Sequence, residues 1–115
     1  MKNLKLVVNN NFKKNKKEIF FVKKELQTIL NLYAKMVSNG TWKDYGLSTG
    51  NKEISFDVYQ RASDKPVIRI LKNLRPKYIN EKFLIKDKDG KIINQSENLN
   101  KLITKTGWNK LRLVK

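Results

Sequence analysis

The chain has 115 residues and a formal net charge of +16, and it contains neither cysteine nor histidine. This length supports one hydrophobic core, so a single domain is expected. The two missing residue types exclude disulfides, thiol nucleophiles, thiolate metal sites and imidazole general bases. No segment approaches the roughly 20 apolar residues that a membrane-spanning helix needs, and we expect a cytoplasmic protein.

The positive charge is concentrated at the two ends of the chain. Residues 1–17 contain six lysines and no acidic residue, and residues 101–115 contain four lysines and Arg112. Together these segments hold +11 of the net +16. Residues 1–17 also have too few apolar residues to offset the entropy of ordering. We predict a basic flexible N-terminal tail at residues 1–17, either simply solvated or attracted to nucleic acid or acidic lipid, and a single α+β domain at residues 18–115.

The domain is predicted to begin with a long helix over residues 22–39. Its apolar residues recur at the spacing of one helical face. They are Val22, Leu26, Ile29, Leu30, Tyr33 and Val37. The pair Asn39 and Gly40 indicates the end of the helix, because both residues tolerate the left-handed backbone conformation.

The following segments alternate apolar and polar residues with the two-residue period of β-strands. We predict strands at residues 42–47, 54–59 and 67–72, and a hairpin that joins residues 83–85 to 92–93 through the turn at 87–90. A short helix is predicted after Ser96, ending at Gly107, and a last strand at residues 108–114. The predicted fold is α+β: an antiparallel sheet of about five or six strands, with one long N-terminal and one short C-terminal helix packed on it.

No motif in the chain indicates an enzyme. The turn at residues 87–90 resembles the start of a calcium loop, but Lys91, Ile92 and Asn98 stand where an oxygen ligand, glycine and glutamate are needed. The remaining acidic residues are scattered, and we expect them to be surface partners of lysines. They include Asp44, Glu53, Asp57, Asp64 and Glu81. We therefore expect a non-catalytic protein with no cofactor and no metal ion.

Residues 65–80 form a basic stretch without any acidic residue. It contains Lys65, Arg69, Lys72, Arg75, Lys77 and Tyr78, and Tyr59 and Arg61 precede it. Cations can hold phosphates while aromatic rings stack on bases, so we predict contacts to nucleic acid through these eight residues. A lysine-rich sheet edge that resists edge pairing explains the same charges. The alternative function is a protein-interaction or accessory subunit that docks an acidic protein partner by its sheet edge or helix face.

Residues 30–45 read LNLYAKMVSNGTWKDY, a helix end followed by a tryptophan, an aspartate and a tyrosine. This segment resembles the signature of a family of short alphaproteobacterial proteins of unknown function. The similarity continues through residues 58–63, 68–70 and 110–114, so it covers about residues 20–115. It departs from the family pattern at residues 73–80. The resemblance implies a bacterial cytoplasmic protein with one compact domain, and it assigns no catalytic residue.

Overall fold

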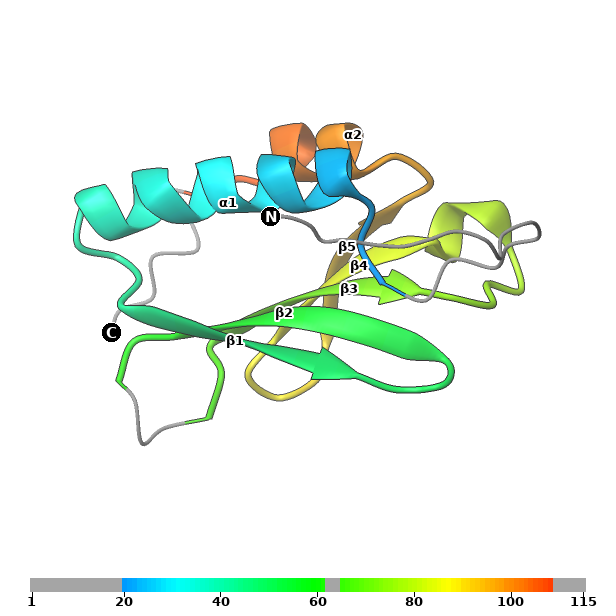
Figure 1. Cartoon of the computed structure of the whole chain (residues 1–115), viewed down its shortest axis with the longest axis horizontal. Coiled ribbons are helices and arrows are strands. Elements are labelled where there is room, and N and C mark those ends of the chain that lie inside the picture. The colour runs from blue at the N-terminus through cyan, green and yellow to red at the C-terminus, as the bar shows by residue number, and fades with distance from the viewer. Residues whose placement is uncertain (1–19, 62–64, 109–115) are drawn as a thin grey trace.

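The computed structural model describes residues 20–61 and 65–108 of the chain (Figure 1). In these residues one long helix precedes a five-stranded sheet, and a short helix follows it. The elements are α1 (Lys23–Ser38), β1 (Asp44–Thr49), β2 (Glu53–Tyr59), β3 (Ile68–Asn73), η2 (Ile79–Glu81), β4 (Phe83–Asp87), β5 (Ile92–Ser96) and α2 (Leu99–Lys105). The predicted tail at 1–17, and all but the first residue of the strand predicted at 108–114, lie outside the described residues.

Helix α1 begins and ends where its sequence signals lie. The backbone N–H of Val22 donates to Oε1 of Glu25 at 2.8 Å, which satisfies one of the amides that a helix start leaves without a partner. At the other end Gly40 adopts a φ of +83°, in the left-handed region that glycine enters without steric cost. The predicted long N-terminal helix is confirmed.

The sheet is an antiparallel meander in which each strand pairs with the next along the chain, in the order β1-β2-β3-β4-β5. The turn between β4 and β5 follows its predicted chemistry. Gly90 has a φ of +85°, and Oδ1 of Asp87 accepts hydrogen bonds from the backbone N–H groups of Asp89 and Lys91. Asp87 therefore stabilises a hairpin turn.

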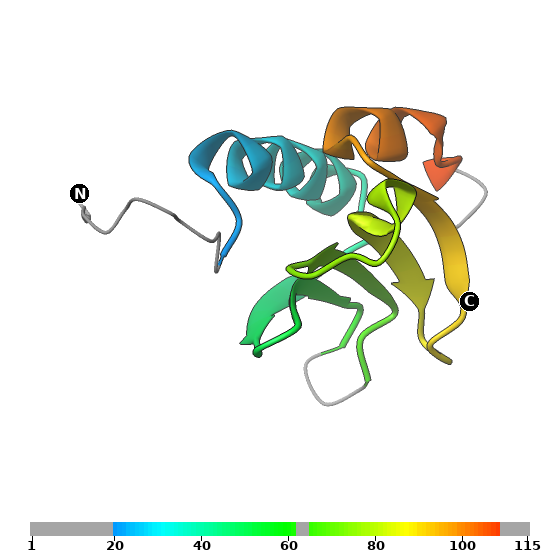
Figure 2. The ribbon, with the colours of Figure 1, turned by 90° about the vertical axis from the view of Figure 1, so that its right-hand side faces the viewer.

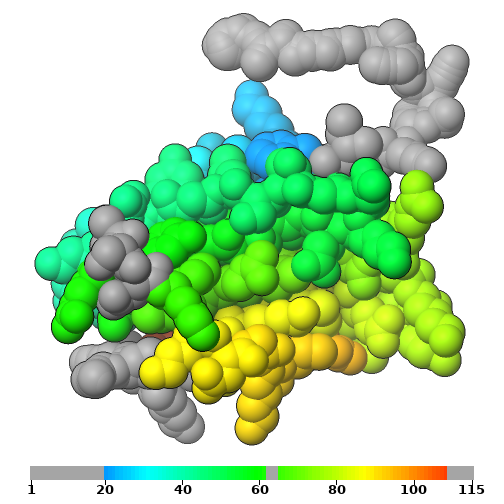
Figure 3. Space-filling model, turned by 90° about the horizontal axis from the view of Figure 1, so that it is seen from below, coloured from blue at the N-terminus to red at the C-terminus, as the bar shows by residue number. Residues whose placement is uncertain are grey.

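Both helices cover the same face of the sheet (Figures 1 and 2). Alternate residues of β2 and β3, among them Phe56 and Ile70, are fully buried against Ile29 and Leu32 of α1 and Leu102 of α2. We call this the closed face. The opposite face, here called the open face, carries no described helix and is seen directly in Figure 3. The predicted α+β architecture of an antiparallel sheet with one long and one short helix is confirmed.

No helix in the described residues combines the length and the apolar composition that crossing a bilayer requires.

Candidate anion-binding site

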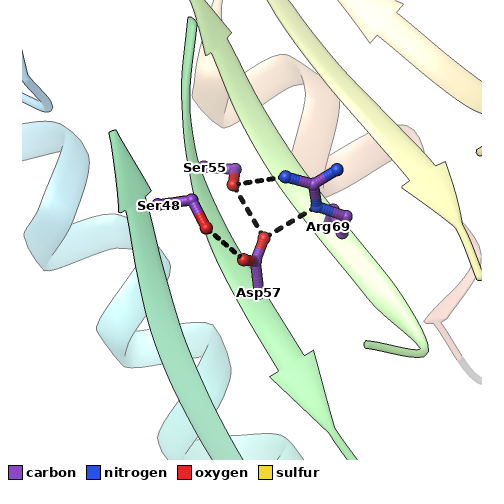
Figure 4. Close-up of polar contacts among 4 residues, drawn as sticks. All are labelled: Ser48, Ser55, Asp57 and Arg69. Carbon is purple, nitrogen blue, oxygen red and sulfur yellow. Dashed lines mark hydrogen bonds and ion pairs between the residues drawn. The ribbon is translucent and has the colours of Figure 1, made fainter. Parts of the chain in front are cut away.

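Four side chains on the open face form a continuous polar network across β1, β2 and β3 (Figure 4). Asp57 lies at its centre and accepts a hydrogen bond from Ser48 Oγ at 2.7 Å, from Ser55 Oγ at 2.7 Å and from Arg69 Nε at 2.9 Å. Arg69 Nη2 donates to Ser55 Oγ at 3.0 Å. The strand register produces this geometry, because Ser48 pairs with Ser55 and Asp57 pairs with Arg69.

The carboxylate of Asp57 is buried although it lies on the open face, with only 4% of the residue exposed. Burial of a carboxylate is costly unless hydrogen bonds and an opposite charge compensate it. The two serine hydroxyls and the Arg69 guanidinium supply both. Asp57 was expected to be a surface partner of a lysine. Its partner is instead an arginine directly across the sheet, a relationship that depends on the strand register.

Arg69 keeps part of its hydrogen-bonding capacity unused. A guanidinium has five N–H donors in a planar fork, and only Nε and one N–H of Nη2 bond to Asp57 and Ser55. Within residues 20–61 and 65–108, no acceptor bonds to Nη1. The side chain is 34% exposed, and no described acceptor occupies this second edge of the fork. A fork held in place on one edge is suited to bidentate binding of a phosphate or carboxylate on the other.

Arg69 lines a hollow of about 440 Å³. Asp57 and Arg69 contribute from β2 and β3, Lys65 and Pro66 from the β2–β3 connection, and residues 87–90 from the β4–β5 turn. Three carboxylates line the hollow: those of Asp57 and Asp87 accept hydrogen bonds from the protein, and that of Asp89 is exposed. The two lysines at the rim, Lys65 and Lys88, are exposed. Among the described residues no cluster of acidic side chains is arranged to hold a metal ion.

Lys72, one of the predicted contacts, is in the interior. It lies on the closed face with 1% of the residue exposed. Its Nζ donates to Oε1 of Glu25 at 2.8 Å and to the backbone carbonyl of Phe20 at 3.1 Å. The ammonium group therefore ties the start of α1 to the sheet, and it is not on a surface that a nucleic acid can reach.

The other predicted contacts divide between the two ends of β3. Tyr59 is half-buried at the end of β2, and the exposed Arg61 and Lys65 lie in the connection that follows it. Arg75, Lys77 and Tyr78 lie beyond the opposite end of β3, beside η2 (Figure 1). Tyr78 is 60% exposed, and Lys77 Nζ lies 5.9 Å from the centre of its ring. One continuous basic stretch in the sequence thus becomes two separate surfaces.

Comparison with known proteins identifies a family and assigns no activity. The family model described as a protein of unknown function (DUF2794) matches residues 19–103. This match includes both helices except the last two residues of α2, and all five strands of the sheet. No curated protein and no solved structure matches the chain significantly. The chemistry of the site therefore has to come from the residues themselves.

Proposed function

Because the chain belongs to the DUF2794 family of proteins of unknown function, we propose its role from its own geometry: it is a small non-catalytic domain that binds nucleic acid through the phosphates, on the open face of its sheet. One observation carries this proposal. Asp57 and Ser55 hold Arg69 along one edge of its guanidinium, no described acceptor occupies the other edge, and the residue lines the hollow.

The mechanism is phosphate neutralisation. Two oxygens of a phosphate accept parallel hydrogen bonds from the open edge of Arg69, while Lys65 and Lys88 at the rim and the nearby Arg61 lower its electrostatic energy. None of these contacts reads a base edge, so binding is largely independent of sequence. The carboxylate of Asp57 positions the guanidinium, and the hydroxyls of Ser48 and Ser55 hold that carboxylate in place.

Salt dependence of binding tests the proposal in the full chain. We expect the affinity for a fluorescein-labelled oligonucleotide, measured by anisotropy, to fall steeply between 50 and 200 mM salt, as counterion release requires. The test variant replaces Arg61, Lys65 and Lys88 by alanine. For a single strand, loss of three phosphate contacts should reduce the slope of log K against log salt by roughly 2.

A matched control removes the same charge from the helices. Lys23, Lys35 and Lys105 are exposed on α1 and α2, and their replacement by alanine leaves the open face unchanged. We expect this control to keep most of the salt slope. If the wild type does not bind at low salt, or if both triple variants lose the same slope, the proposed surface is incorrect.

A second candidate function rests on the outer edge of the sheet. In the described part of the chain β1 has a neighbouring strand on one side only, and its Tyr45 and Leu47 are 42% and 46% exposed. Such an edge suits addition of a strand from an acidic protein partner, the docking mode of an accessory subunit. A protein that remains bound stoichiometrically after nuclease treatment, and that is lost on Leu47→Asp substitution, favours this second function.

A further inference from the structure

We propose that the connection between β3 and β4 contacts the surface of an anionic phospholipid bilayer. This connection, residues 74–82, contains η2 and is called the tip below. It lies beyond the end of β3 that is remote from Lys65, so the proposal is independent of the anion-binding site. Its starting point is a pair of adjacent apolar side chains. Tyr78 and Ile79 are 60% and 70% exposed, the highest values among the large apolar side chains of residues 20–61 and 65–108.

Backbone hydrogen bonds hold the base of the tip. The N–H of Asn73 donates to the carbonyl of Lys82 at 2.7 Å, which closes the connection on itself. The N–H of Leu74 donates to the carbonyl of Lys52 at 2.8 Å, which fastens the tip to the β1–β2 turn. Residues 77–80 lie beyond these bonds and are all exposed. A projection that is already ordered can enter an interface with little further loss of conformational entropy.

Cations surround the tip. The tip, the β1–β2 turn and the start of α1 lie at one end of the molecule, which faces the viewer in Figure 2. A hollow of about 290 Å³ connects the tip to the helix, because both Lys82 and Lys24 line it. The described cations of this end are Lys23, Lys24, Lys52, Arg75, Lys77 and Lys82. Apart from Glu25, which pairs with Lys72, the described acids there are Glu53, Glu81 and Glu97. This end is therefore basic.

The preceding part of the chain adds to this charge. Phe20 is the first described residue, and its carbonyl accepts a hydrogen bond from Nζ of Lys72 at the start of α1. Residues 1–17 are thus covalently attached at the same end, and they contain six lysines and no acidic residue. Each lysine or arginine near an anionic bilayer strengthens binding roughly fivefold. The charge of this end therefore matches an anionic surface.

The apolar side chains distinguish a bilayer from nucleic acid. Ile79 has no ring and cannot stack on a base, and Nζ of Lys77 already lies 5.9 Å from the centre of the Tyr78 ring. The headgroup interface of a bilayer accepts all three side chains, because tyrosine is enriched there, isoleucine enters the hydrocarbon and lysine reaches the phosphates. A bilayer also needs no complementary pocket to receive a projecting tip. Such a contact requires no membrane-spanning helix.

Co-sedimentation of the full chain with vesicles tests the proposal. We expect binding to vesicles of phosphatidylcholine and phosphatidylglycerol to be at least about tenfold tighter than binding to phosphatidylcholine alone. Replacing both Tyr78 and Ile79 by alanine keeps the net charge and should weaken binding to the anionic vesicles about tenfold. The matched control replaces Val37 and Ile92, which are 39% and 47% exposed at the opposite end of the molecule. We expect this control to bind as the wild type does.

A fluorescent label separates insertion of the tip from general attraction by charge. The chain has no cysteine, so Ile79→Cys and Ile92→Cys each create a unique labelling site. A polarity-sensitive fluorophore at position 79 should shift its emission to shorter wavelength on anionic vesicles, and one at position 92 should not.

Three outcomes overturn the inference. They are absence of binding to anionic vesicles, binding without a response at position 79, and a response at position 79 to an oligonucleotide but not to vesicles. The last outcome would assign the tip to nucleic acid. Failure of the wild type to bind an oligonucleotide overturns the proposed function alone and leaves the expected vesicle binding unchanged.

Discussion

Arg69 and Lys72 stand three residues apart on β3, each paired with a carboxylate, yet they have opposite surroundings. Lys72 points into the closed face, where its Nζ meets Glu25 and the carbonyl of Phe20 beneath the start of α1. Arg69 points to the open face, where Asp57 and Ser55 hold one edge of its guanidinium and no described acceptor occupies the other. The first pair fastens the fold, and the second orients a cation toward solvent. Two cations on the same strand can thus have different roles in the folded protein.

The closed-face pair gains its importance from a shared oxygen. Oε1 of Glu25 accepts from the backbone N–H of Val22 and from Nζ of Lys72, both at 2.8 Å. The same atom therefore satisfies the first turn of α1 and compensates the buried ammonium. Removing Lys72 would leave Glu25 without its cation and would create a cavity beneath the helix.

The largest expected effect is the loss of stability on Lys72→Ala. Breaking a buried ion pair by removing one partner costs about 3–5 kcal/mol, and Glu25, 14% exposed in its side chain, keeps some solvent, which points to the lower end. Urea unfolding followed by circular dichroism measures this change. Lys35→Ala on the exposed side of α1 is the control and should leave the unfolding midpoint unchanged. A midpoint for Lys72→Ala equal to that of the control would show that the buried pair does not fasten the helix.

Arg69→Ala should cost less, about 1–2 kcal/mol, because Arg69 is itself 34% exposed and Asp57 keeps hydrogen bonds from Ser48 and Ser55. The same urea titration measures this loss of stability. A loss as large as that of Lys72→Ala would remove the distinction between the two faces, since Arg69 would then be a structural cation as well. A small loss of stability combined with a clear loss of oligonucleotide binding would support the distinction between the two faces.

The sequence predicted the elements well because their signals are local. The helical spacing before Asn39 and Gly40, the strand alternation around Phe56 and the turn residues at 87–90 each concern neighbouring residues, and each lies as expected. The alternation also indicates the position of Lys72. Lys72 is in phase with Ile68 and Ile70, which are buried, so its side of the strand was readable even though its charge suggested a surface.

The candidate site could be predicted only in part. Arg69 lies out of phase with its isoleucine neighbours, which places it on the face opposite them. Its partnership with Asp57 requires the register between β2 and β3, and no local pattern states that register. The separation of Lys65 from Lys77 has the same origin. The six residues of the extended strand β3 place the two ends of the basic stretch about 20 Å apart. The order of charges in the sequence does not by itself give this distance.

The smallest expected effect concerns Tyr33, a second polar group on the closed side. Burial raises the pKa of its hydroxyl above the ordinary 10.0, and the charges of Asp44 and Tyr45 raise it further. The hydroxyl also donates to the carbonyl of Lys43 at 3.3 Å, a long bond whose contribution is at most about 1 kcal/mol.

The raised pKa fixes the sign of a pH effect. Above pH 10 the unfolded chain releases the Tyr33 proton more readily than the folded chain, so the contribution of Tyr33 to stability is complete below that pH and is lost as pH rises through the folded pKa. Tyr33→Phe should therefore be slightly less stable than wild type at pH 8, and the gap should narrow or reverse toward pH 11. Other titrating groups are common to both proteins and cancel in the difference. A stability difference between Tyr33→Phe and wild type that stays constant over this range would mean that folding does not raise the pKa of Tyr33. The contrast between the two faces would then rest on the Lys72 pair alone.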